Sequence, residues 1–102
     1  MEIRTGSRLR SQIDDTEIIV IRALPGDVAL TCGGHPMIKQ VAQPAPGLTA
    51  KDNASDGTHL GKRYTLAGTD LEVLVTKPGH GTLALGGQAL TLKDVRPLPS
   101  SD

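Results

Sequence analysis

The chain has 102 residues, which suits a single domain over residues 1–102 with a modest core, because about 65% of the surface of such a domain is buried on folding. Lysine plus arginine and aspartate plus glutamate number 11 each, so the formal net charge is zero and argues against a nucleic-acid-binding or anionic-membrane surface. Phe and Trp are absent, Tyr64 is the one aromatic residue, and Cys32 has no internal disulfide partner, so we expect an aliphatic core.

No apolar run approaches the roughly 20 residues of a membrane-spanning helix. The opening residues, MEIRTGSRLR, lack the apolar core of a signal peptide. We therefore expect a cytoplasmic protein that does not associate with membranes.

The first predicted strand covers residues 7–12, where Arg8 and Arg10 alternate with smaller or apolar residues. This alternation is typical of a half-exposed strand with its basic side chains in water. Asp14 and Asp15 follow and are interpreted as a turn. Residues 16–23 (TEIIVIRA) are dense in β-branched side chains, which favour a second strand.

Turn residues divide the rest of the first unit. Pro25-Gly26-Asp27 stops the second strand, and we predict a hairpin there, with residues 28–31 returning antiparallel to residues 16–23. Gly33-Gly34 interrupts the chain again, and residues 36–41 complete the unit.

Residues 42–61 separate the two halves of the chain. The stretch Gln43 to Gly61 holds two prolines and three glycines with few large apolar residues, which is typical of a mobile linker or surface loop. Because so long a loop inside a compact domain is unusual, we expect it to join two separately nucleated units.

The second half repeats the pattern of the first. We predict strands over residues 62–66, 71–76, 82–85 and 89–95, with a hairpin at Lys77-Pro78-Gly79 and a turn at Gly86-Gly87. The final residues, 96–102 (RPLPSSD), form a proline-broken tail.

An internal repeat underlies this similarity. Without a gap, residues 16–39 align with residues 69–92 and seven of the 24 positions are identical, where composition alone gives about two. The identical pairs are Thr16/Thr69, Val20/Val73, Pro25/Pro78, Gly26/Gly79, Leu30/Leu83, Gly33/Gly86 and Gly34/Gly87. We predict an all-β fold of two tandem small antiparallel units, residues 7–41 and 62–95, related by an internal pseudo-two-fold axis and each covering the other's apolar face.

The repeated unit resembles desulforedoxin, a small iron protein whose fold also forms the N-terminal domain of desulfoferrodoxin-type superoxide reductases. In the second unit the resemblance rests on Tyr64, the run from Glu72 to Thr76, the segment from Gly79 to Leu83, and Gly87. In the first unit it rests on Cys32-Gly33-Gly34-His35-Pro36-Met37. Desulforedoxin is a homodimer, so the resemblance implies a fusion of two such subunits.

The resemblance does not extend to the iron ligands. The family binds iron through four cysteines per unit, and these positions fall here on Ile13, Thr16, Cys32, Gly33, Leu66, Thr69, Leu85 and Gly86. One thiolate of eight survives, whereas a tetrahedral thiolate site needs four. We therefore expect no cofactor and expect apolar side chains to fill the former metal pockets.

A degenerate zinc or iron site is the alternative. Cys32 and His35 form a C-x-x-H spacing that Asp14 or Asp15 could complete, and Asp14, Cys32 and His35 are the candidate metal ligands. The competing interpretation of Cys32 is a buried residue at the end of a strand. His59 and His80 lie in a loop and at a turn, where we expect solvated imidazoles.

The sequence places no catalytic residues, since no Ser, His, Asp or Cys constellation follows from spacing alone. The leading hypothesis is a non-enzymatic β scaffold, monomeric or homodimeric, that binds another protein. Alternatives are a degenerate desulforedoxin-like metal or redox protein using Cys32 and His35, and a small-molecule site at the junction between the units.

Overall fold

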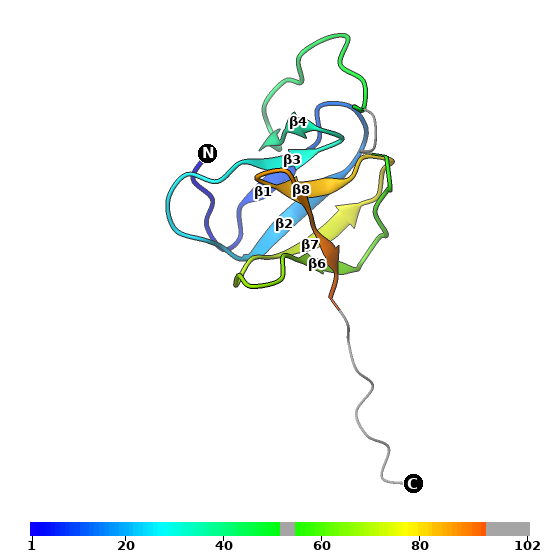
Figure 1. Cartoon of the computed structure of the whole chain (residues 1–102). Coiled ribbons are helices and arrows are strands. Elements are labelled where there is room, and N and C mark those ends of the chain that lie inside the picture. The colour runs from blue at the N-terminus through cyan, green and yellow to red at the C-terminus, as the bar shows by residue number, and fades with distance from the viewer. Residues whose placement is uncertain (52–54, 94–102) are drawn as a thin grey trace, which may run out of the picture.

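A computed structural model describes residues 1–51 and 55–93, and all regular structure in these ranges is β-strand. The ten strands are β1 Arg8–Arg10, β2 Glu17–Arg22, β3 Leu30–Cys32, β4 His35–Pro36, β5 Ile38–Lys39, β6 Arg63–Thr65, β7 Glu72–Lys77, β8 Leu83–Leu85, β9 Gln88–Ala89 and β10 Thr91–Leu92 (Figure 1). The prediction of an all-β fold is confirmed. The end of the strand expected over residues 89–95 and the tail 96–102 fall outside the described residues.

The larger sheet has six antiparallel strands in the order β10-β6-β7-β2-β1-β5. Its two longest strands, β2 and β7, pair with each other at the centre, and Val20 lies opposite Val73. These residues are 53 positions apart, which is the offset of the sequence repeat. The β-branched residues of the two halves thus meet in one ladder.

The smaller sheet has four antiparallel strands in the order β4-β3-β8-β9. At its centre β3 pairs with β8, and Thr31 lies opposite Ala84, again at an offset of 53. The hairpins β3–β4 and β8–β9 close through the glycine pairs Gly33-Gly34 and Gly86-Gly87, in which every glycine has positive φ. Two successive positive-φ residues match the type I′ turn, which glycine adopts without steric cost.

Two expected hairpins are wrong. The chain leaves β2 in the larger sheet at Pro25-Gly26-Asp27 and enters β3 in the smaller sheet, and it crosses from β7 to β8 in the same way after Pro78. Residues 28–31 therefore do not return along residues 16–23. The physical reason is that pairing β2 with β7, and β3 with β8, joins two short units into sheets long enough to bury a shared core.

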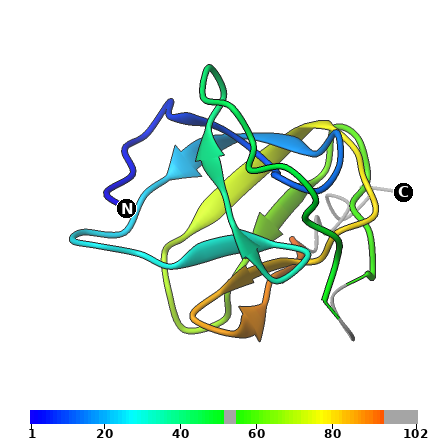
Figure 2. The same cartoon turned by 90° about the horizontal axis from the view of Figure 1, so that it is seen from above.

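Neither sheet belongs to one repeat alone, because each contains strands from both. The connecting segment 42–61 contains no strand in its described part and runs along the surface. It is attached to the sheets by backbone hydrogen bonds, including Lys51 N–H to Gly33 O at 2.9 Å and Thr58 N–H to Gly79 O at 3.0 Å. Figure 2 shows the smaller sheet, in cyan and orange, beside the larger sheet, in blue and yellow, with the green part of this segment passing in front of them.

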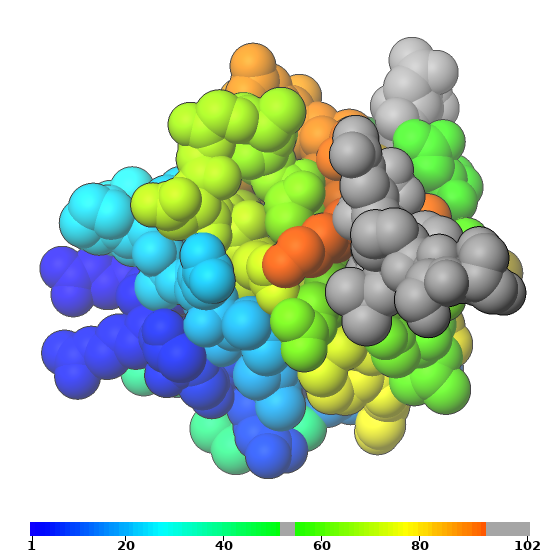
Figure 3. Space-filling model, turned by 90° about the horizontal axis from the view of Figure 1, so that it is seen from below, coloured from blue at the N-terminus to red at the C-terminus, as the bar shows by residue number. Residues whose placement is uncertain are grey.

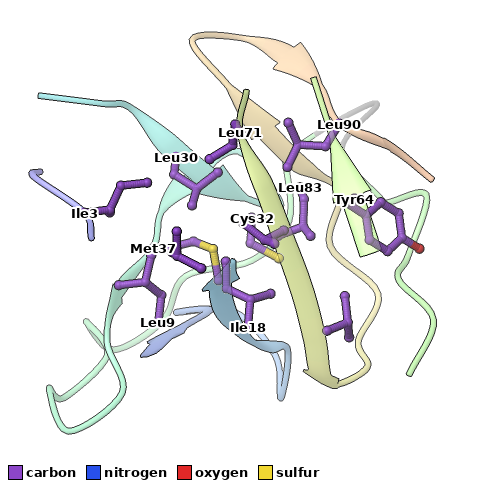
Figure 4. Packing of buried hydrophobic residues seen from close by; sticks show 13 residues of the cluster. Ile3, Leu9, Ile18, Leu30, Cys32, Met37, Tyr64, Leu71, Leu83 and Leu90 are labelled. Atoms are coloured by element: carbon purple, nitrogen blue, oxygen red, sulfur yellow. The ribbon is translucent and has the colours of Figure 1, made fainter. Parts of the chain in front are cut away.

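The core lies between the two sheets (Figure 4). Because side chains alternate along a strand, β2 and β7 turn one apolar set inward and leave the other on the opposite face. The buried apolar residues are Ile3, Leu9, Ile18, Val20, Leu30, Cys32, Met37, Tyr64, Leu71, Val73, Val75, Leu83 and Leu90. Aliphatic side chains dominate this core, as the composition predicts.

Candidate functional site

The Asp14 carboxylate connects the two repeats. Its Oδ1 accepts a hydrogen bond from the Thr16 backbone N–H at 3.0 Å, which is the local turn contact expected of aspartate. Its Oδ2 accepts bonds from the backbone N–H groups of His80 at 2.8 Å and Gly81 at 2.7 Å. Asp14 therefore does more than form a turn, because it holds the loop between β7 and β8.

The electrostatic surroundings keep this carboxylate ionised. Partial burial of Asp14 alone would raise its pKa, but the hydrogen bonds donated by Thr16, Gly81 and Ser11 outweigh it, so the pKa of Asp14 is lowered. Charge-assisted bonds to backbone N–H groups favour the charged form. The ionised carboxylate is thus a structural acceptor with its lone pairs occupied.

The Cys32 side chain packs against the loop between β7 and β8. A Cβ built on Gly81 would stand 2.7 Å from the Cys32 Sγ, and one built on Gly79 would collide with the Thr16 hydroxyl. The two glycines therefore allow the loop to approach Cys32 and Thr16 closely. The proximity of Thr16 lowers the pKa values of Asp14 and Cys32. The Thr16 Oγ1 is itself buried and has no hydrogen bond of standard geometry among the described residues.

The Cys32 thiol is fully buried and reduced. Burial raises its pKa, and the nearby Asp14 charge adds to the increase, while Ser11 and Thr16 oppose it. A thiol with a raised pKa is a poor nucleophile and a poor metal ligand at neutral pH. The interpretation of Cys32 as a buried residue at a strand end is confirmed.

His35 is near Cys32 along the hairpin but engages a different partner. Antiparallel pairing of β3 with β4 places Cys32 opposite His35, because only the two turn residues Gly33 and Gly34 separate them. The His35 Nε2 lies 2.8 Å from the Thr49 carbonyl oxygen, in the segment that follows β5. Within residues 1–51 and 55–93, no group of three or more His, Cys, Asp or Glu side chains is arranged to hold a metal ion. The expectation that the protein carries no cofactor stays a prediction.

Of the positions that the resemblance aligns with iron ligands, Ile13, Leu66 and Leu85 carry packed apolar side chains, whereas Thr69 is exposed. The Ile13 Cδ1 fills the space beside Gly33. Leu66 and Leu85 pack against the core. His59 and His80, expected at the surface, are both exposed.

The outer face of the six-stranded sheet presents a different kind of surface. Arg8 lies opposite Ile19, Ile19 opposite Leu74, and Leu74 opposite Arg63, so one row crosses β1, β2, β7 and β6. The arginines are exposed and the two apolar side chains are half-buried. We call this row, together with Arg22 at the end of β2, the basic face.

Charge is distributed unequally between the two sheets. The strands of the four-stranded sheet contain no charged residue. Those of the six-stranded sheet carry the cations Arg8, Arg10, Arg22, Lys39, Arg63 and Lys77 against the anions Glu17 and Glu72. A chain of zero net charge thus concentrates positive charge on one sheet.

Some of these cations are paired and others are not. The Glu72 side chain on β7 is buried, and its carboxylate forms ion pairs with Lys93 at 2.8 Å and Arg63 at 3.0 Å. Glu17 forms an ion pair with Lys77 at 3.0 Å. Hydrogen bonds and charge from these lysines and Arg63 lower the pKa values of both glutamates. Arg8 and Arg22 make no ion pair within the part of the chain that the structure describes.

Sequence reasoning missed the basic face as a site. The alternation around Arg8 predicts a strand with one solvent-exposed face, and the β-branched residues predict the strand that contains Ile19. Neither pattern predicts that Leu74 and Arg63, more than 40 positions away from Ile19, continue the same row. The reason is that cross-strand register is set by long-range packing.

Among the described residues, no helix is long and apolar enough to cross a membrane. No known protein family, curated protein sequence or solved structure matches this chain.

Proposed function

We propose that the chain is a non-enzymatic protein-binding module and that the basic face is its contact surface. The observation that carries the proposal is the row from Arg8 through Ile19 and Leu74 to Arg63 on the sheet face turned away from the core. Arginine is enriched at protein interfaces, and the fully buried core of an interface is more apolar than the rest of the surface. Ile19 and Leu74 can lose their remaining exposure to a partner.

Charge complementarity sets the chemistry of that partner. Arg8 and Arg22 are not neutralised by any described residue, so an approaching acidic surface gains electrostatic attraction. Arg63 already forms an ion pair with Glu72, so it contributes mainly the planar surface of its guanidinium group in a fixed position. The partner is therefore a protein surface with apolar and acidic residues in proximity.

We also propose that the fold is a duplication with an internal pseudo-two-fold axis, related to the desulforedoxin architecture without its iron. The support is that the central residue pairs of both sheets, Val20 with Val73 and Thr31 with Ala84, obey the repeat offset of 53. The contact of Ile13 with the Gly33 position agrees with an apolar replacement of a metal knuckle. An experimental structure in which the two halves do not superpose would contradict this part.

Affinity capture from the source cells with matched variants tests the binding proposal. The double variant Arg8→Glu/Arg22→Glu reverses two unpaired charges on the basic face. The control, Arg4→Glu/Lys51→Glu, makes the same change in net charge at exposed residues outside the strands. A partner must be retained by the parent and the control and lost from the basic-face variant.

The proposal fails if every captured protein is retained equally by both double variants. Thermal unfolding of the purified variants accompanies the capture, because loss of a partner counts only where the variant is folded. A truncating substitution, Ile19→Ala, removes apolar contact area without altering charge and should weaken binding of the same partner.

A further inference from the structure

A shallow groove lies beside β1 and β5 and shares Arg8 with the basic face. It has a volume of about 370 Å³ and is lined by Met1, Glu2, Arg8, Leu9, Lys39 and Val41, among others. Pockets for small molecules range from about 300 to 1,000 Å³, so this groove suits a small ligand. In Figure 3 the N-terminal residues, in dark blue, stand out at the side of the molecule.

Apolar side chains in the groove are unusually exposed. Val41 is 90% exposed and Met1 42%, and these are two of the four large apolar residues left exposed in the described part of the chain. Leu9 also lines the groove, but its side chain is only 2% exposed and packs in the core. Covering Val41 and Met1 with a hydrocarbon would remove apolar area from water.

The charges around these side chains favour an anion. Lys39 lies opposite Leu9 across β5 and β1, so the two side chains leave from the same face of the sheet, and Lys39 is exposed at its edge. Arg8 also borders the groove, and neither cation forms an ion pair with a described residue. Glu2 is the acidic residue of the lining, and the Met1 ammonium is paired with Asp27 at 3.1 Å, so Arg8 and Lys39 leave an excess of one positive charge.

We propose that this groove binds a small aliphatic carboxylate. The hydrocarbon chain lies against Met1 and Val41, and the carboxylate pairs with Lys39 at the open end. This inference does not depend on the protein-binding proposal, since its carrying residues, Lys39 and Val41, are not part of the basic face.

A peptide added as a further strand is a poorer occupant. Although β5 is an edge strand, it has two residues, and the Lys39 carbonyl oxygen accepts a hydrogen bond from the Ala42 N–H at 2.9 Å. The chain therefore turns immediately after β5 and presents no extended edge for pairing. The side chains, and not the backbone, form the recognition surface.

The test is a titration of the ¹⁵N-labelled full chain with octanoate, followed by amide chemical shifts. We expect saturable shifts confined to residues around Leu9, Lys39 and Val41. Octylammonium, which has the same chain and the opposite charge, and acetate, which lacks the chain, should each bind at least about tenfold more weakly, because each loses one of the two contacts.

Two variants complete the test. Lys39→Glu, at an exposed position, should weaken octanoate at least about tenfold, whereas Lys51→Glu, the control, should leave its affinity unchanged. Preserved dispersion of the remaining amide signals shows that Lys39→Glu is folded. The proposal is overturned if octanoate at millimolar concentration gives no saturable shifts, if octylammonium binds equally well, or if Lys39→Glu binds like the parent.

Discussion

The carboxylate of Asp14 accepts a 2.7 Å hydrogen bond from the backbone N–H of Gly81, which lies 67 positions further along the chain. One side chain of the first repeat thereby fixes the crossover loop of the second repeat above Cys32. The close packing of Gly81 against the Cys32 Sγ depends on this position of the loop. Asp14 is thus a tie between the halves as well as a turn residue.

Asp14→Asn should destabilise the fold by about 1–3 kcal/mol. The amide removes the charge, and its NH₂ group faces backbone donors if the side chain keeps its orientation, so at least one partly buried N–H loses its acceptor. Asp15→Asn is the matched control, because Asp15 is the exposed neighbour and should change the free energy of unfolding little. Urea unfolding measures both, and equal stability of the two variants would show that the tie contributes nothing.

The strands could be predicted from the sequence because their signals are local. The β-branched run around Ile19 gives β2, and alternation around Leu9 gives β1 with its buried position. The glycine pairs mark hairpins because consecutive glycines permit two residues of positive φ.

Strand partners and loop contacts could not be predicted in the same way. A proline and a glycine stop a strand equally well at a hairpin and at a crossover, so Pro25-Gly26 did not reveal that β3 joins another sheet. The bond from Asp14 to Gly81 and the row from Arg8 to Arg63 combine residues from both repeats. Such contacts depend on the register of the assembled sheets, which no local pattern encodes.

Gly34→Val and Gly87→Val should each destabilise the protein by more than about 1–2 kcal/mol, the cost of placing a Cβ at positive φ. Their φ values are +85° and +84°. A Cβ on Gly87 meets open space, whereas one on Gly34 must displace the Lys51 side chain, so Gly34→Val should be affected at least as strongly.

Two further variants separate backbone strain from side-chain bulk. Gly87→Asn should lose less stability than Gly87→Val, because asparagine tolerates the left-handed conformation. Gln88→Val, on the adjacent strand residue, should be nearly neutral. If thermal unfolding finds Gly87→Val as stable as the parent, the turn does not require positive φ.

Purified protein should contain no stoichiometric zinc or iron. Asp14 has both oxygens occupied by backbone donors, Cys32 has a raised pKa, and His35 contacts the Thr49 carbonyl. Plasma emission spectroscopy measures the metal content directly. One equivalent of metal that disappears in Cys32→Ser would contradict this prediction and make Asp14 and His35 the first ligands to examine.

The free energy of unfolding should be greatest between about pH 5 and pH 8 and should fall on both sides for identifiable reasons. Asp14, Glu17 and Glu72 have lowered pKa values in the folded protein. Their contribution is therefore present above the unfolded carboxyl pKa of about 4 and is lost as the pH falls through the folded values. The acid side of the profile reports these three carboxylates.

Cys32 determines part of the alkaline side. Its folded pKa is raised, so the stabilisation is complete below the unfolded thiol pKa of about 8.5 and is lost as the pH rises toward the folded value. Cys32→Ala should lower stability at every pH by removing a buried side chain, but it should also flatten the decline above pH 8.5. Urea unfolding across pH separates the uniform offset from the change in slope. An alkaline decline of the same steepness in parent and variant would show that the thiol stays unionised in the unfolded chain or that other groups determine this limb.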